Sequence, residues 1–143
     1  MADAIAVTNT SPVIALVGIG ELRLLDALFE TVTGARAASR TTWRCVLSDA
    51  AHSPRGCLLD PGERAAIALA VSMPGTWILL DEFAARKVAG DLGLPVKGTL
   101  GVLVEAKRRG LVVAVRPLIE RMLANGCRLA PELVAMVLSS VGE

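Results

Sequence analysis

The chain has 143 residues, a length that suits one hydrophobic core but not two. We therefore expect a single domain over residues 1–143. Hydrophobic residues make up 53% of the sequence and charged residues 20%, which excludes a disordered chain and predicts buried helix faces or a sheet buried on both sides. The net charge of +1 does not indicate a nucleic-acid partner. Any binding of nucleic acid must therefore depend on a local cluster of basic residues.

The beginning of the sequence shows neither a membrane span nor a secretory leader. The longest uncharged stretch, Ala4 to Gly20, is interrupted by a polar turn around Pro12, and Asp3 stands where a leader would carry basic residues. The cysteines lack the spacing of a disulfide framework or a zinc site; they are Cys45, Cys57 and Cys127. We expect reduced thiols, a cytoplasmic protein and no membrane partner.

The first part of the chain predicts a strand followed by two helices. Residues 5–7 form a short apolar run, after which Ser11 is a candidate N-cap and Pro12 a candidate first helical residue. Apolar residues at three- and four-residue spacing predict an amphipathic helix over residues 21–29. Residues 34–58 show no clear period, so the sequence leaves the structure of this segment open.

The second part begins with a strong helix start. Asp60 is a candidate N-cap, Pro61 follows it and Glu63 is a candidate capping glutamate, which together predict a helix through Ala70. The apolar run 76–80 predicts a strand buried on both faces that ends at Asp81. A short strand at Val96 is expected, and the remaining predicted helices cover residues 82–92, 99–109, 117–124 and 131–140.

This alternation of strands and helices predicts an α/β fold with a parallel sheet covered by helices on both faces. In such sheets, functional groups gather at the edge where the strands end. Asn9 and Asp81 each follow a predicted strand. Both residues are therefore candidates for a functional site at the carboxyl edge of the sheet.

Several motifs occur in a fixed order along the chain; they span Val7–Leu16, Leu59–Ala70, Leu79–Arg86 and Gly93–Leu103. Together they resemble the PIN-domain proteins, in particular a branch related to VapC-type toxins. The order of the motifs is more specific than any one of them. The resemblance covers most of the chain except about its second quarter, and it implies a three-layer PIN-like fold with a central parallel sheet.

The resemblance also implies an activity, a cofactor and partners. It implies a Mg²⁺- or Mn²⁺-dependent endoribonuclease, with RNA as substrate and a cognate antitoxin protein as partner. The acidic positions of the family fall on Asn9, Glu63 and Asp81, with Glu82 as an adjacent candidate ligand. These residues are of the expected kind because hard divalent cations prefer oxygen ligands and can activate water for attack on a phosphodiester.

Two positions depart from the acidic pattern. Asn9 offers a carbonyl oxygen but one negative charge less, and Cys45 would place a soft thiol where a carboxylate is expected. A second interpretation is therefore a catalytically impaired PIN-like domain that binds protein or RNA. A flavodoxin-like domain would need a glycine-rich loop after the first strand, and the turn at Asn9 has none.

Each candidate residue also has a structural interpretation. Glu63 could serve only as a capping residue, Asp81 as the N-cap of the helix that follows it, and Asn9 as a turn residue with a left-handed backbone. The apolar composition also suggests a homodimer.

Overall fold

The computed structural model describes residues 5–29, 31–34, 59 and 61–143. Within these residues, parallel strands form one sheet in the order β2-β1-β3-β4. The strands are β1 (Ile5–Thr8), β2 (Thr31–Gly34), β3 (Trp77–Leu79) and β4 (Val96–Lys97). The predicted parallel arrangement is therefore confirmed. The two central strands, β1 and β3, are those that precede Asn9 and Asp81.

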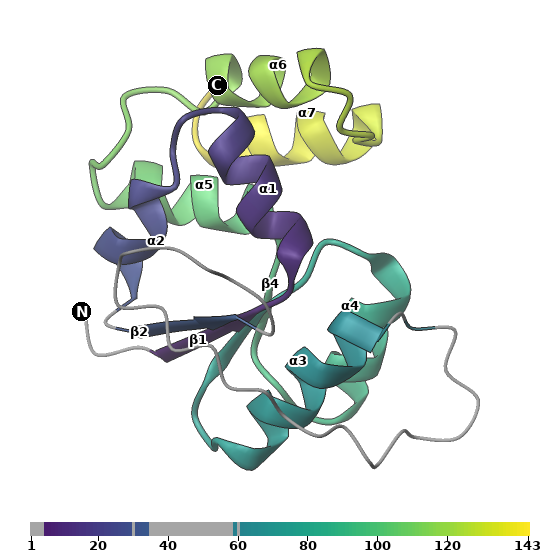
Figure 1. Cartoon of the computed structure of the whole chain (residues 1–143). Helices are drawn as coiled ribbons and strands as arrows, with labels where there is room; N and C mark the ends of the chain where they lie inside the picture. Colours follow the sequence, from purple (N-terminus) through teal and green to yellow (C-terminus); the bar gives the residue numbers. More distant parts are fainter. Residues whose placement is uncertain (1–4, 30, 35–58, 60) are drawn as a thin grey trace.

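Helices cover both faces of this sheet, as Figure 1 shows. The helices α3 and α4 lie on one face, and α1, α2, α5, α6 and α7 lie on the other. No helix in the described ranges is long and apolar enough to cross a membrane. The fold is a three-layer α/β arrangement, as predicted. The helices are α1 (Thr10–Gly18), α2 (Arg23–Leu28), α3 (Pro61–Ser72), α4 (Phe83–Asp91), α5 (Thr99–Arg108), α6 (Arg116–Ala124) and α7 (Pro131–Ser140).

The central strands contribute to two separate hydrophobic cores because their side chains alternate between the faces of the sheet. Val7, Ile78 and Leu80 pack in the core under α3 and α4. Ala6 and Leu79 pack in the larger core under the other helices. All five side chains are fully buried. The prediction that β3 is buried on both faces is therefore confirmed.

The start of α1 differs from the prediction. The helix begins at Thr10 with Asn9 as its N-cap, instead of beginning at Pro12 after a Ser11 cap. Pro12 is thus the third helical residue. It is tolerated there because the N–H groups of the first helical turn have no partner within the helix.

The strand β2 is an element that the sequence did not predict. The strand has only four residues, Thr31–Gly34, which is too short to show a clear alternation of apolar and polar residues. Parallel pairing with β1, in which Val32 lies opposite Ala6, places the segment in the sheet. Tertiary pairing thus decides its conformation. Most of the segment 34–58, for which no element was predicted, lies outside the described residues.

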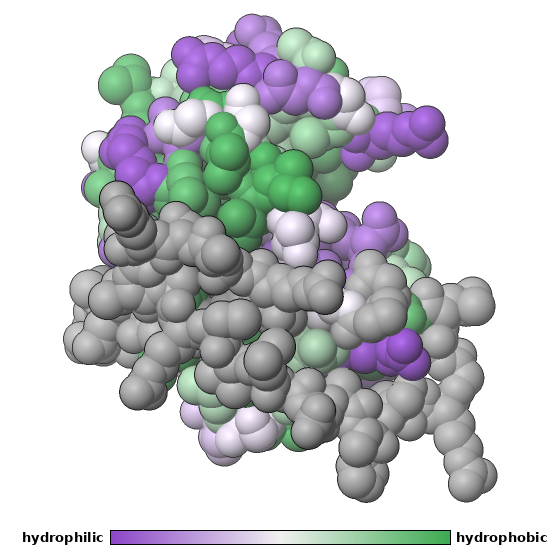
Figure 2. Space-filling model, viewed as in Figure 1, coloured by the Kyte–Doolittle hydropathy of each residue, from purple (hydrophilic) through white to green (hydrophobic). Residues whose placement is uncertain are grey.

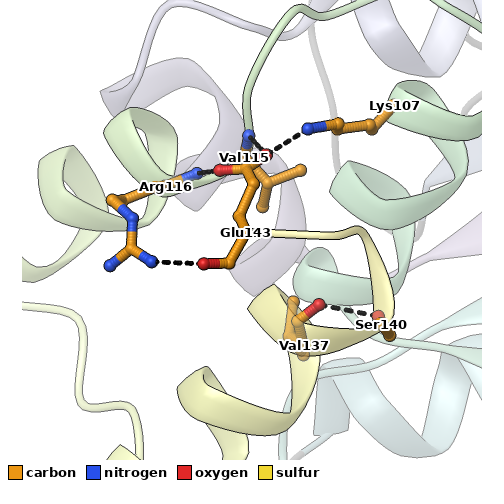
Figure 3. A network of polar contacts seen from close by, with 6 residues as sticks. All are labelled: Lys107, Val115, Arg116, Val137, Ser140 and Glu143. Atoms are coloured by element: carbon orange, nitrogen blue, oxygen red, sulfur yellow. Dashed lines mark hydrogen bonds and ion pairs between the residues drawn. The ribbon is translucent and has the colours of Figure 1, made fainter.

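A carboxylate from beyond α7 joins three helices (Figure 3). Glu143 Oε1 accepts hydrogen bonds from Lys107 Nζ at 2.6 Å and from the Val115 N–H at 2.7 Å. Its Oε2 accepts one from the Arg116 N–H at 2.8 Å. The N-cap of α6 is Val115, whose side chain has no polar atom. Glu143 therefore satisfies helix N–H groups that the local sequence leaves without a partner.

These bonds lower the pKa of Glu143 to about 2, chiefly through the hydrogen bond from Lys107 and then through those from the Val115 and Arg116 amides. Its pKa in the folded chain thus lies below the ordinary value of 4.5. Its contribution to stability is complete above about pH 4.5 and is lost as the pH falls toward 2.

We expect Glu143→Gln to lower the urea midpoint at neutral pH and to reduce the loss of stability between about pH 4.5 and 2. Urea unfolding followed by circular dichroism at several pH values measures both effects. Glu120→Gln, at an exposed position of α6, is the matched control. If both variants lose stability with acid as the parent chain does, the Glu143 network does not contribute in this way.

Candidate functional site

The candidate residues lie at the edge where the central strands end. Thr8 pairs with Leu79 in the register of β1 and β3, so Asn9 and Asp81 follow neighbouring strands at the same edge. The helix α3 packs against these strands and ends just before β3 begins, so it runs opposite to β3. Glu63, in the first turn of α3, therefore lies toward that same carboxyl edge.

Asn9 has a buried side chain with an unused oxygen. The residue is 5% exposed, and its Oδ1 has no hydrogen-bond partner among the residues that the structure describes. Although asparagine is a favoured N-cap, the side chain makes no capping bond to α1. The backbone is extended, with φ −86° and ψ −174°, so the left-handed turn considered for this residue is wrong. An unpartnered buried amide oxygen is costly and is available to a ligand.

Asp81 binds the beginning of α5. Its Oδ1 accepts a hydrogen bond from the Thr99 N–H at 2.7 Å, and its Oδ2 accepts one from the Thr99 hydroxyl at 2.7 Å. The N-cap of α5 is Gly98, which has no side chain to perform this role. Asp81 does not cap the helix that follows it, because the N-cap of α4 is Glu82. Asp81 is a cap, but for a helix later in the chain.

The space beside Asp81 is kept open by Gly98. A Cβ atom at Gly98 would lie 3.2 Å from Asp81 Oδ1 and 3.5 Å from Arg86 Nη1. The first distance is tighter than an ordinary contact, so any larger residue would press on the carboxylate. The same geometry shows that the Arg86 guanidinium, on α4, faces this small space. A carboxylate and a cation thus border it.

The remaining candidates are placed differently. Glu63 is 5% exposed, whereas Glu82 is exposed at the start of α4. Within the described ranges, no three histidine, cysteine, aspartate or glutamate side chains are grouped so that they could hold a metal ion. Asp60 and Cys45 lie outside those ranges, so the capping interpretation of Glu63 and the acidic position assigned to Cys45 stay predictions.

A groove of about 870 Å³ opens beside Asp81. Figure 2 shows a hollow between the surface formed by α6 and α7 and the surface over α4, where the groove lies. Its lining includes apolar residues of α1, α5 and α7. The charged residues of the lining are four basic and two acidic: Arg86, Lys97, Arg108, Arg128, Asp81 and Glu105. The groove is therefore more basic than the chain as a whole.

Sequence reasoning missed two residues that shape this site. Thr99 was predicted only as a helix start, and Arg86 was quoted only as part of a motif. Neither has a local signal for its role, because the Thr99 partner is 18 residues earlier and Arg86 meets the site only through folding. Only the motif Leu79–Arg86, which contains both Asp81 and Arg86, indicated a role for Arg86.

The comparisons with known proteins bear on this geometry. A family model described as PIN domain matches residues 41–143, which is most of the chain. The chain belongs to the PIN-domain family. Glu63, Asp81 and Glu82 lie within the matched residues, and Asn9 lies before them. The searches of curated proteins and of solved structures found no match.

PIN-domain membership supplies the coarse functional class. The family has a nuclease-type fold, its members are generally dependent on divalent metal ions, and they generally bind RNA. The candidate residues Asn9, Glu63 and Asp81 at the carboxyl edge, and the basic groove beside Asp81, are the features of this chain to be tested for such properties.

The link from Asp81 to Thr99 can be tested through stability. We expect Thr99→Val, which keeps the shape but removes the hydroxyl donor, to lower the free energy of unfolding by about 1–2 kcal/mol. Thr10→Val is the matched control because Thr10 is exposed and also begins a helix, α1. We expect the control to change stability by less than about 0.5 kcal/mol. Equal effects in urea unfolding would show that the hydrogen bond from the Thr99 hydroxyl to Asp81 contributes nothing to the stability of the chain.

Proposed function

We propose that this chain is a metal-dependent endoribonuclease of the VapC toxin type, acting at the carboxyl edge of β1 and β3. The observation that carries the proposal is the side-chain oxygen of Asn9, which is buried at this edge and has no hydrogen-bond partner within the described part of the chain. A buried polar atom of this kind needs a partner, and a cation bound at the edge would be one. Asp81 follows the neighbouring strand, and Glu63 lies toward the same edge.

The donor atoms fit Mg²⁺ or Mn²⁺ in chemical type. Asn9, Glu63 and Asp81 would hold the ion through oxygen atoms, and Glu82 is exposed at the adjacent position. The oxygens of Asp81 keep unused lone pairs after accepting the bonds from Thr99. When bound, the ion supplies an activated water and neutralises charge on the phosphodiester. The amide at Asn9 gives this site less charge than a full carboxylate set, so we expect modest metal affinity.

The groove supports RNA as the substrate. Arg86 and Arg128 line it and make no ion pair within the described part of the chain. Their guanidinium groups are suited to bind phosphate oxygens. Arg86 also faces the space beside Asp81, which would hold a phosphate close to the candidate metal ligands. The chain's own cations thus orient the backbone of the substrate.

The VapC-type interpretation brings further expectations. A toxin of this kind would pair with a cognate antitoxin protein and act on RNA in the cytoplasm. A homodimer is consistent with apolar side chains on the surface of α1, where Ile14 is 64% and Val17 is 55% exposed. These expectations depend on the resemblance and on composition.

The cleavage activity is tested with the purified chain and a labelled RNA. We expect cleavage with Mn²⁺ or Mg²⁺ and none with a chelator, because the candidate donors are hard oxygen ligands. Asp81→Asn and Glu63→Gln should each lower the rate by roughly 10- to 100-fold. Rates are normalised to the folded fraction, since Asp81 also caps α5.

Asp91→Asn is the matched control for this experiment. Asp91 is the exposed last residue of α4, and within the described part of the chain its carboxylate pairs with the exposed Lys87, whose Nζ lies 3.2 Å from Oδ2. Its loss should leave the rate unchanged. Cleavage that persists in chelator, or that falls equally in all three variants, would contradict the proposal.

Asn9 offers a gain-of-function test. Asn9→Asp restores a negative charge at the buried oxygen, and we expect Mn²⁺ affinity to rise about tenfold or more because affinity follows ligand charge. Isothermal titration calorimetry with Mn²⁺ measures this change. Val113→Asp adds a negative charge at a position that is 94% exposed and lines neither described cavity, and it should have little effect.

A binding domain without catalysis is the second candidate function. It is favoured by the Asp81 carboxylate, both oxygens of which already accept hydrogen bonds from Thr99. The lack of a grouped set of three metal-binding side chains among the described residues favours it too. The Mn²⁺ titration separates the two candidates. No binding by the parent chain and no gain in Asn9→Asp would support the binding domain.

A further inference from the structure

Asp81 and Thr99 form a pair in which a buried residue holds an exposed carboxylate. Thr99 is 1% exposed, whereas Asp81 is exposed at the carboxyl edge of the sheet. An exposed side chain ordinarily changes its rotamer within nanoseconds. Here each carboxylate oxygen accepts a hydrogen bond at 2.7 Å, one from the Thr99 N–H and one from the Thr99 hydroxyl. The carboxylate is therefore held in one orientation although solvent reaches it.

Both donors belong to the same residue, so they lie side by side. Two neighbouring donors that each contact one oxygen of a carboxylate must face the side from which both oxygens can be reached at once. A guanidinium group that binds a carboxylate through two parallel hydrogen bonds uses that side in the same way. A cation would need the same side to contact both oxygens. Thr99 therefore leaves Asp81 able to bind a cation through one oxygen at a time.

This restriction affects divalent cations differently. Ca²⁺ takes about six to eight oxygen ligands in a flexible shell and can bind both oxygens of one carboxylate. Mg²⁺ requires a compact octahedral shell, keeps several waters and needs only one or two carboxylates, and Mn²⁺ shares its octahedral oxygen geometry. The part of the chain that the structure describes has no group of three metal-binding side chains that could supply further oxygens. A site of this kind suits the ions that keep their waters.

We propose that Thr99 is a positioning residue that makes the candidate site select Mg²⁺ and Mn²⁺ against Ca²⁺, because it keeps Asp81 from offering both oxygens to one ion. This inference rests on the proposed function and concerns the choice of ion at the same site. Thr99 acts through Asp81. Its hydroxyl is the group that can be tested, since the backbone N–H at this position is kept by any residue except proline.

The test is isothermal titration calorimetry of the full chain with Mn²⁺ and, in separate titrations, with Ca²⁺. We expect the parent chain to bind Mn²⁺ at least about tenfold more tightly than Ca²⁺. Thr99→Val removes the hydroxyl and frees Asp81 Oδ2, so the carboxylate can turn. We expect its Mn²⁺ affinity to fall about tenfold while its Ca²⁺ affinity is unchanged or rises. Thr99→Ala, which removes the same donor, should give the same change.

Two further variants serve as controls. Thr99→Ser keeps the hydroxyl donor and should keep the ratio of the two Kd values within about twofold of the parent chain. Thr76→Val removes a hydroxyl from another buried threonine, which is 2% exposed and precedes β3, at the end of the strand away from Asp81. This variant should leave the ratio unchanged. Affinities are expressed per folded chain, as measured by circular dichroism.

The ratio separates a positioning role from a purely structural one. A variant that only loosens the start of α5 would bind both ions less tightly and leave the ratio as it is, and this result would overturn the inference. A parent chain that binds Ca²⁺ as tightly as Mn²⁺ would also overturn it.

The failure of this inference is distinct from that of the proposed function. If the parent chain cleaves RNA with Mn²⁺ while Thr99→Val keeps the parent ratio, only the role of Thr99 is lost. If the parent chain binds neither ion and cleaves no RNA, the metal-dependent function is lost as well.

Discussion

Two hydrogen bonds from Thr99 to Asp81 connect the end of β3 with the start of α5, and the arrangement of the site depends on this connection. They fix the direction of α5, which covers one face of the sheet and forms a wall of the groove. They also fix the carboxylate itself, because each oxygen has a donor. Gly98 is compatible with this geometry because it leaves room beside Asp81 Oδ1.

The start of α6 is also capped by a carboxylate from outside the helix. There the first amide groups are bound by Glu143, in the way that Asp81 binds the start of α5. In both helices the local N-cap cannot act, since Gly98 has no side chain and Val115 has no polar atom. A carboxylate is stabilised near the positive end of a helix, and in both cases here the carboxylate belongs to a residue outside that helix. Helix ends thereby hold separate parts of the fold together.

The sequence predicted those features that are written in neighbouring residues. The α/β class, the burial of β3 and the span of α7 follow from apolar runs, turn residues and periodicity. The family motifs identified Asn9 and Asp81 as candidate site residues, and both lie at one edge of the sheet. These predictions succeeded because each depends on a local pattern that tertiary packing reinforces.

Most of the features that the sequence could not predict depend on contacts between distant segments. β2 needs its pairing with β1, and the capping of α5 needs Asp81, which lies 18 residues before Thr99. Ser11 was predicted as the N-cap of the first helix, yet the helix begins two residues earlier than predicted, at Thr10 with Asn9 as its N-cap. The sequence also could not predict that Asn9 Oδ1 is buried without a hydrogen-bond partner among the described residues, because burial is a property of the folded chain.

The Glu143 network has a consequence for how the C-terminal helices open and close. The amides of Val115 and Arg116 find their acceptor in a residue 28 and 27 positions later, and Lys107 of α5 shares it. The N-terminus of α6 is therefore completed only when the segment after α7 has packed. The helices α5, α6 and α7 should then exchange their amide hydrogens as one cooperative unit, with a common opening free energy, instead of fraying one by one.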